Sequence, residues 1–64
     1  MGKVRRGGYV FFWWKGDRDP RHVHVYRGVR LVVKWDVEHW KVMEGRENRR
    51  VMALIRELLA EGKL

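Results

Sequence analysis

Two histidines separated by one residue, His22 and His24, are the side chains of this 64-residue chain best suited to chemistry. An imidazole can act as a general acid or base near neutral pH, and it is a common metal ligand. Side chains two residues apart on a β-strand lie on one face, about 6.5–7 Å apart, so this pair can share a substrate or an ion. Asp17, Asp19 and His39 are further side chains able to complete a three-ligand metal site. A pattern of three residues is too short to predict a metal, so we expect no metal and no other cofactor.

The residue types that the chain lacks exclude several classes of enzyme. It has no Cys, Ser, Thr or Gln, so catalysis by a serine, threonine or cysteine nucleophile, thiolate zinc sites and disulfides are all excluded. Cleavage of RNA is not excluded, because the 2′-hydroxyl of the RNA is itself the nucleophile. In that hypothesis His22 and His24 are the catalytic residues and an arginine holds the phosphate. The sequence does not decide between an enzyme and a binding protein.

The positive charge of the chain lies mainly in its first half. The net charge is +7, and residues 1–30, with eight basic and two acidic residues, account for +6 of it. Such asymmetry predicts an anionic partner, either nucleic acid (RNA in preference to DNA) or a small acidic protein. The predicted nucleic-acid-binding residues are Lys3, Arg5, Arg6, Arg21, Arg27, Arg30 and Lys34.

Hydrophobic periodicity and turn residues predict the elements that position these side chains. We expect strands over residues 9–15, 21–27 and 29–36, a loop over residues 16–20 and a tight turn at Arg27-Gly28. Residues 37–43 form either a short fourth strand or a connector. Residues 46–61 predict an amphipathic helix with Gly62 just beyond its end, because apolar residues recur at helical spacing at Val51, Leu54, Ile55, Leu58 and Leu59.

These elements predict an α+β fold, a small antiparallel sheet of three to four strands with one C-terminal amphipathic helix packed on one face. Residues 1–8 are a basic N-terminal arm, and residues 9–64 are a single domain. The chain has neither a transmembrane-length apolar run nor a signal peptide, so we expect a cytoplasmic protein without membrane contact. Its Arg-rich composition without Cys or Gln is also typical of thermophiles.

Strict alternation assigns side chains to the two faces of this sheet. Val29, Leu31, Val33 and Trp35 should face the helix. The opposite, open face should carry His22, His24 and Tyr26 together with Arg30, Val32, Lys34 and Asp36. The first strand is apolar on both sides, so Tyr9, Phe11 and Trp13 or Val10, Phe12 and Trp14 must lie outside the core. That row is a dimer interface, a partner surface or a base-stacking platform, unless the arm or residues 37–43 cover it.

The segment Asp19-Pro20-Arg21-His22-Val23-His24-Val25-Tyr26 resembles the motif of the bacterial family catalogued as domain of unknown function 4160. The resemblance extends over about residues 9–62. It implies a component of a toxin–antitoxin module, either a toxin-like ribonuclease or an antitoxin, with Pro20, His22 and His24 at any functional centre. Many members have a second proline where this chain has Arg21.

We therefore expect a nucleic-acid- or partner-binding module of a toxin–antitoxin-like system. One alternative is a metal-independent ribonuclease toxin that uses the strand histidines. Another is a structural protein that forms a homodimer through its aromatic strand.

Overall fold

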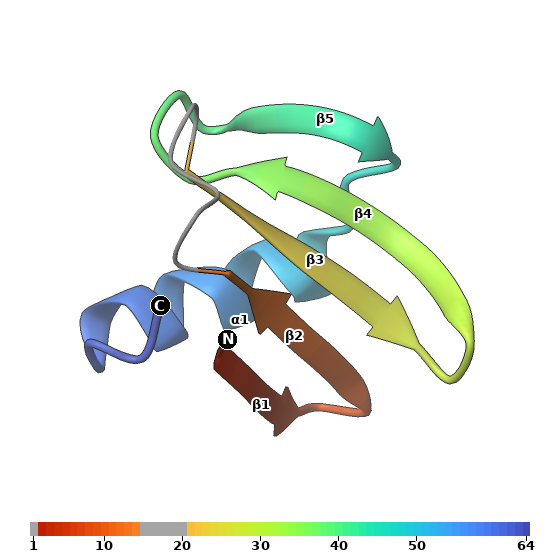
Figure 1. Cartoon of the computed structure of the whole chain (residues 1–64), viewed down its shortest axis with the longest axis horizontal. Coiled ribbons are helices and arrows are strands. Elements are labelled where there is room, and N and C mark those ends of the chain that lie inside the picture. The colour runs from red at the N-terminus through yellow and green to blue at the C-terminus, as the bar shows by residue number, and fades with distance from the viewer. Residues whose placement is uncertain (1, 15–20) are drawn as a thin grey trace.

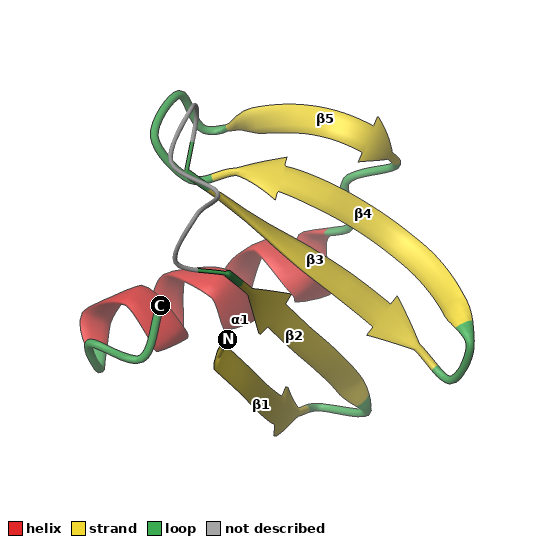
Figure 2. Cartoon of the chain, in the orientation of Figure 1, coloured by secondary structure: helices red, strands yellow, loops and turns green. Residues whose placement is uncertain are grey.

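The computed structural model describes residues 2–14 and 21–64, so the predicted loop over residues 16–20 lies outside the described residues. The elements follow the order βββββα (Figure 1), with the bounds β1 Gly2–Arg6, β2 Tyr9–Trp13, β3 His22–Arg27, β4 Arg30–Asp36, β5 Lys41–Gly45 and α1 Arg49–Ala60. The strands form one sheet in the order β1-β2-β3-β4-β5, and each pairs antiparallel with the next. Figure 2 shows α1 packed against one side of this sheet, which confirms the predicted α+β class.

The sheet has five strands rather than the predicted three to four. Residues 2–6 of the basic arm form β1, because Gly7 (φ 60°) and Gly8 (φ 84°) both adopt the positive φ that a two-residue hairpin turn needs. The register pairs Arg6 with Tyr9 directly across this turn. The ambiguous residues 37–43 divide into a four-residue turn and the beginning of β5. Both edges of the sheet therefore come from segments with no clear strand pattern.

Helix α1 begins three residues later and ends one residue earlier than predicted. The side chain of Asn48 accepts hydrogen bonds from the backbone N–H groups of Arg50 and Val51, at 2.8 and 3.2 Å, and so caps the first turn. At the other end, Gly62 (φ 73°) follows the helix, and the N–H of Lys63 donates to the carbonyl of Leu58 at 2.9 Å.

No helix within the described residues is long and apolar enough to cross a membrane.

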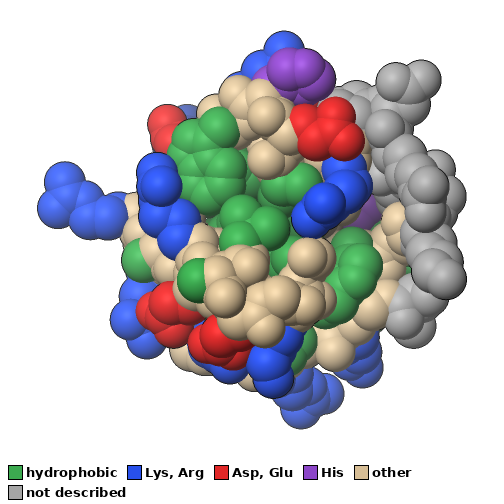
Figure 3. Space-filling model, turned by 90° about the vertical axis from the view of Figure 1, so that its left-hand side faces the viewer, with side chains coloured by type: hydrophobic (Ala, Val, Ile, Leu, Met, Phe, Trp, Pro, Cys, Tyr) green, Lys and Arg blue, Asp and Glu red, His purple; other side chains and the backbone are tan. Residues whose placement is uncertain are grey.

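The hydrophobic core lies between α1 and the face of the sheet that it covers. The buried apolar residues are Tyr9, Phe11, Val23, Val25, Val33 and Trp35 from the strands and Val51, Leu54, Ile55 and Leu58 from the helix. Strand β2 thus turns Tyr9 and Phe11 inward, and Trp13 packs against the core. Figure 3 looks onto the end of the molecule where α1 ends and shows hydrophobic side chains gathered between charged ones.

The predicted faces of β4 are wrong before Val33, because the β3–β4 ladder contains a bulge. Val25 pairs with Val33 but Tyr26 pairs with Leu31, so Val32 is an extra residue and the alternation changes phase. Leu31 therefore lies on the face opposite α1, and Val32 packs against the core. Val29 is fully exposed in the turn instead of facing the helix.

Candidate nucleic-acid interface

The face of the sheet opposite α1 is covered by no described element, and we call it the open face. On the helix side of the sheet, Val4, Phe11, Val25 and Val33 are register partners in one row. The residues that alternate with them along each strand point to the open face. The open face is formed by Lys3, Arg5, Val10, Phe12, Trp14, His22, His24, Tyr26, Leu31 and Lys34, and on β5 by Lys41 and Glu44. One cross-strand row of this face runs Lys3, Phe12, His24, Lys34, so that two cations flank an aromatic pair, and it ends on β5 at Glu44.

Aromatic rings form a connected line along the open face. The Phe12 ring meets the edge of Tyr26 at 5.7 Å between centroids and stacks near-parallel on Trp14 at 6.2 Å. Trp14 in turn meets His24 edge-on at 5.0 Å, and His24 meets His22 at 5.1 Å. Trp14 is 43% exposed, which is unusual for so large an apolar side chain. The line therefore offers flat apolar surfaces to a ligand while its members hold one another in place.

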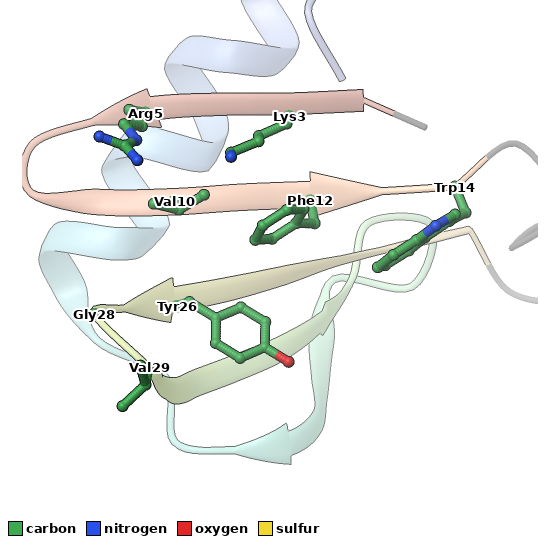
Figure 4. Close-up of a pocket in the computed structure, with 8 residues that line it drawn as sticks. All are labelled: Lys3, Arg5, Val10, Phe12, Trp14, Tyr26, Gly28 and Val29. Carbon is green, nitrogen blue, oxygen red and sulfur yellow. The ribbon is translucent and has the colours of Figure 1, made fainter.

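Cations border this aromatic line on the side of β1. The Lys3 ammonium lies 5.6 Å from the centroid of the Phe12 ring, within the range of a cation–π contact. A shallow cavity of about 520 Å³ lies between Lys3 and Arg5 on one side and Tyr26 on the other (Figure 4), with Phe12 and Trp14 in its floor. Figure 4 shows the Tyr26 hydroxyl directed away from β1 and β2. This combination of stacking surface and positive charge suits single-stranded nucleic acid.

Only part of the predicted basic set lies on the open face. Lys3, Arg5 and Lys34 do so. Arg6 points to the helix side, where it forms a bidentate ion pair with Glu61 (2.6 and 2.9 Å) and approaches Glu57 at 3.7 Å. The hydrogen bond from Arg6 holds the pKa of the Glu61 carboxyl below its ordinary value. Arg6 thus joins β1 to the end of α1 and is committed to the fold.

The remaining predicted cations lie elsewhere. Arg21 is exposed just before β3, and its carbonyl accepts a hydrogen bond from the N–H of Val37 at 3.1 Å. Arg30 was expected beside Lys34, but the bulge puts it opposite Arg27, on the side of the sheet that faces α1. Arg27 stacks over the ring of Tyr9 at 5.8 Å. Strict alternation assigned Arg30 to the wrong face, because the extra residue Val32 moves the residues before it in β4 to the opposite face of the sheet.

The two strand histidines lie together, as their spacing predicts. The rings of His22 and His24 are 5.1 Å apart on the open face, and both are partly exposed. No group of three potential ligands is placed to hold a metal ion among the residues that the structure describes. The candidate ligands Asp17 and Asp19, and Pro20 of the motif, lie outside that part of the chain.

A buried carboxylate, which strand alternation placed on the open face, organises the turn beside the histidines. Asp36 pairs in register with His22, yet it is fully buried. Its carboxylate points toward the backbone of the turn over residues 37–40. It accepts hydrogen bonds from the backbone N–H groups of Glu38 and His39, both at 2.9 Å, and from the Nδ1 of His39 at 2.8 Å. The His39 ring is therefore held through Nδ1, and its side chain stays 62% exposed.

The same turn ends in a backbone conformation that the sequence does not reveal. Trp40 has φ 55°, in the left-handed region that bulky residues rarely adopt. Its ring meets Trp35 edge-on at 5.1 Å, and the guanidinium of Arg56 lies 4.5 Å from its centroid. Packing between the sheet and α1 thus holds the turn, and with it Asp36 and His39.

We expect this buried carboxylate to give the protein an acid-sensitive stability. Burial alone raises the pKa of Asp36, but the hydrogen bonds from His39 and Glu38 outweigh it, and the net pKa lies below the ordinary value. A pKa that is lower in the folded state contributes stability above the unfolded pKa, near 4, and loses it as pH falls through the folded pKa. The thermal midpoint followed by circular dichroism should be level from pH 7 to about pH 5 and fall below that.

Two variants check this pH dependence. Asp36→Asn should lower the midpoint at pH 7 and flatten its fall in acid. Glu38→Gln, in the same turn, is the matched control, because the Glu38 side chain makes no hydrogen bond or ion pair within the described residues. Wild-type acid sensitivity in Asp36→Asn would contradict the assignment.

The described architecture defines a small α+β protein, a meander sheet with one covering helix and a basic, aromatic open face. Residues 7–63 match the family described as Domain of unknown function (DUF4160), so the chain belongs to this family. The matched range includes β2 to α1 and begins after β1. No curated protein and no solved structure matches the chain.

Proposed function

We propose that the protein binds single-stranded RNA on its open face. The observation that carries the proposal is the connected line of partly exposed aromatic rings centred on Phe12, bordered by Lys3, Arg5 and Lys34. Stacking accepts any base, and the cations suit the backbone phosphates, so binding should depend weakly on sequence.

One feature of the open face favours RNA over DNA. The chain has no Ser or Thr, and its two side-chain hydroxyls are those of Tyr9 and Tyr26. Tyr9 is buried in the core, whereas Tyr26 lines the cavity on the open face. A hydroxyl can both donate to and accept from a ribose 2′-OH, the group that distinguishes RNA from DNA. The toxin–antitoxin-like setting, expected from the motif around His22, is part of the proposal as its biological context.

Titrating the protein into a fluorescently labelled ten-nucleotide RNA of mixed sequence, followed by anisotropy, tests the proposal. The three cations of the open face alone contribute about −2 to the slope of log K against log salt for a single strand, so raising salt from 50 to 200 mM should weaken binding at least about 15-fold. DNA of the same sequence should bind more weakly, and duplex RNA weakest, since its bases cannot stack on the rings. Absence of binding at 50 mM salt, or an affinity independent of salt, would overturn the proposal.

A metal-independent ribonuclease is the second candidate, favoured by the 5.1 Å separation of the His22 and His24 rings beside the same aromatic surface. One imidazole would remove the proton of the 2′-hydroxyl and the other would protonate the leaving oxygen. Gel analysis of the titrated RNA distinguishes the two functions. Fragments that vanish in both His22→Ala and His24→Ala indicate the nuclease, and intact RNA indicates a binding protein.

A further inference from the structure

Three arginines surround a cavity on the helix side of the β3–β4 turn. Arg27 and Arg30 flank this turn, and Arg46 follows β5. Together they line a cavity of about 640 Å³ that Tyr9 and Asn48 also border, and no acidic residue lines it among those described. A guanidinium group is planar, permanently charged and suited to bidentate contact with phosphate. We call the three residues the arginine cluster.

The fold holds this cluster against electrostatic repulsion. Arg27 and Arg30 are direct cross-strand partners, and like charges in that relation destabilise a sheet. Within residues 2–14 and 21–64, none of the three forms an ion pair with an acidic side chain. Arg27 is held over the ring of Tyr9 and so keeps its charge near the cavity. A bound anion would relieve the repulsion that the protein alone leaves in place.

The guanidinium groups, rather than the nearby start of α1, carry the positive charge beside this cavity. The side chain of Asn48 already accepts from the N–H groups of Arg50 and Val51, which would otherwise point toward a ligand. The charge available to an anion is therefore that of the cluster itself.

Neighbouring cavities with shared lining residues lie between the open face and the cluster. The cavity of about 520 Å³ on the open face shares Arg5, Val10 and Gly28 with a second one of about 530 Å³ between the two hairpin turns. That second cavity shares Tyr9 with the cavity of the arginine cluster. Neighbouring cavities thus follow one another from the aromatic line, around the end of the sheet at Gly28, to Arg46.

We propose that the arginine cluster binds backbone phosphates of the same RNA strand whose bases stack on the open face. The strand follows the path around the turn at Gly28, so that one ligand contacts both sides of the sheet. This inference rests on the proposed function and adds to it a second contact region and a minimum ligand length. A ligand of about four nucleotides occupies the open face alone, and one of about ten reaches the cluster.

The test compares the salt dependence of wild type with that of the triple variant Arg27→Ala/Arg30→Ala/Arg46→Ala. With six cations on phosphates, wild type should bind the ten-nucleotide RNA with a slope of log K against log salt of about −4. The triple variant should retain a slope of about −2, and it should bind a four-nucleotide RNA as wild type does. The double variant Arg30→Ala/Arg46→Ala keeps Arg27 on Tyr9 and should give a slope of about −2.8.

A matched control separates a local site from a general effect of charge. The triple variant Arg49→Ala/Arg56→Ala/Lys63→Ala removes the same charge from exposed positions on or just after α1 that line neither the cluster nor the open face, and it should keep a slope near −4. An equal loss of slope in this control, or a wild-type slope in the cluster variants, overturns this inference while RNA binding stands. Absence of binding by wild type overturns the proposed function as well. Circular dichroism verifies that each variant is folded.

Discussion

Replacing Phe12 by alanine is expected to weaken RNA binding by roughly 5- to 150-fold, since a stacked base contributes about 1–3 kcal/mol by alanine substitution. Phe12 is the centre of the aromatic line, because its ring contacts Trp14, Tyr26 and the ammonium of Lys3. Its removal both takes away a stacking surface and loosens the rings on either side. Anisotropy with the ten-nucleotide RNA at 100 mM salt measures the change in Kd.

Variants at the same position and on β5 make this measurement specific. Phe12→Tyr keeps an aromatic ring and should bind within a few-fold of wild type, whereas Phe12→Leu keeps apolar bulk without a stacking face and should resemble Phe12→Ala. Met43→Ala removes another exposed apolar side chain, away from the aromatic line, and should bind as wild type does. A folded Phe12→Ala protein with wild-type affinity would exclude the stacking surface.

The neighbouring substitution Phe11→Ala should have the opposite effect, a loss of stability rather than of binding. Phe11 is fully buried between Val4 and Val25 on the core face, and truncating a buried phenylalanine costs about 3–5 kcal/mol. In a chain of this size the whole unfolding free energy is of order 3–10 kcal/mol. The thermal midpoint should therefore fall by roughly 12–40 °C in circular dichroism.

A milder variant keeps the comparison informative if Phe11→Ala does not fold. Phe11→Leu retains most of the volume, so it should remain folded at 25 °C, with a lowered midpoint and unchanged RNA affinity once folded. Phe12→Ala, one residue away on the other face, should shift the midpoint far less than Phe11→Ala. Equal midpoints for Phe11→Ala and Phe12→Ala would contradict the assignment of the two faces.

The sequence predicted those parts of the fold that depend on local periodicity. The stripe from Val51 to Leu58 requires a helix, and the alternation of Val23 and Val25 with histidines requires a strand with one buried face. The edge strands were harder to predict, since β1 has a single apolar residue, Val4, and β5 is exposed along its whole length. Edge strands form because a neighbour offers hydrogen bonds, and this signal is absent from their own residues.

Most residues of the candidate site could be predicted from the sequence, but their arrangement on the sheet could not. Alternation placed His22, His24 and Tyr26 together, and the excess of charge indicated an anionic partner. The bulge at Val32 could not be predicted from the sequence. Because of it, Arg30 lies beside Arg27 in the arginine cluster and not on the open face. Arg46 escaped prediction because its role depends on where β5 ends relative to the β3–β4 turn, a relation between segments distant in the chain.

The order of the elements along the chain has a consequence for synthesis on the ribosome. Every strand pairs with its immediate successor, so the sheet assembles from hairpins with short loop closures as they emerge. The side chains that cover its apolar face, from Val51 to Leu58, are made after all five strands. Until then the nascent sheet exposes apolar residues on both sides, Phe11 and Val25 on one and Phe12 and Trp14 on the other. Emergence of α1 is therefore the step that buries one of these two apolar faces and leaves the aromatic open face exposed.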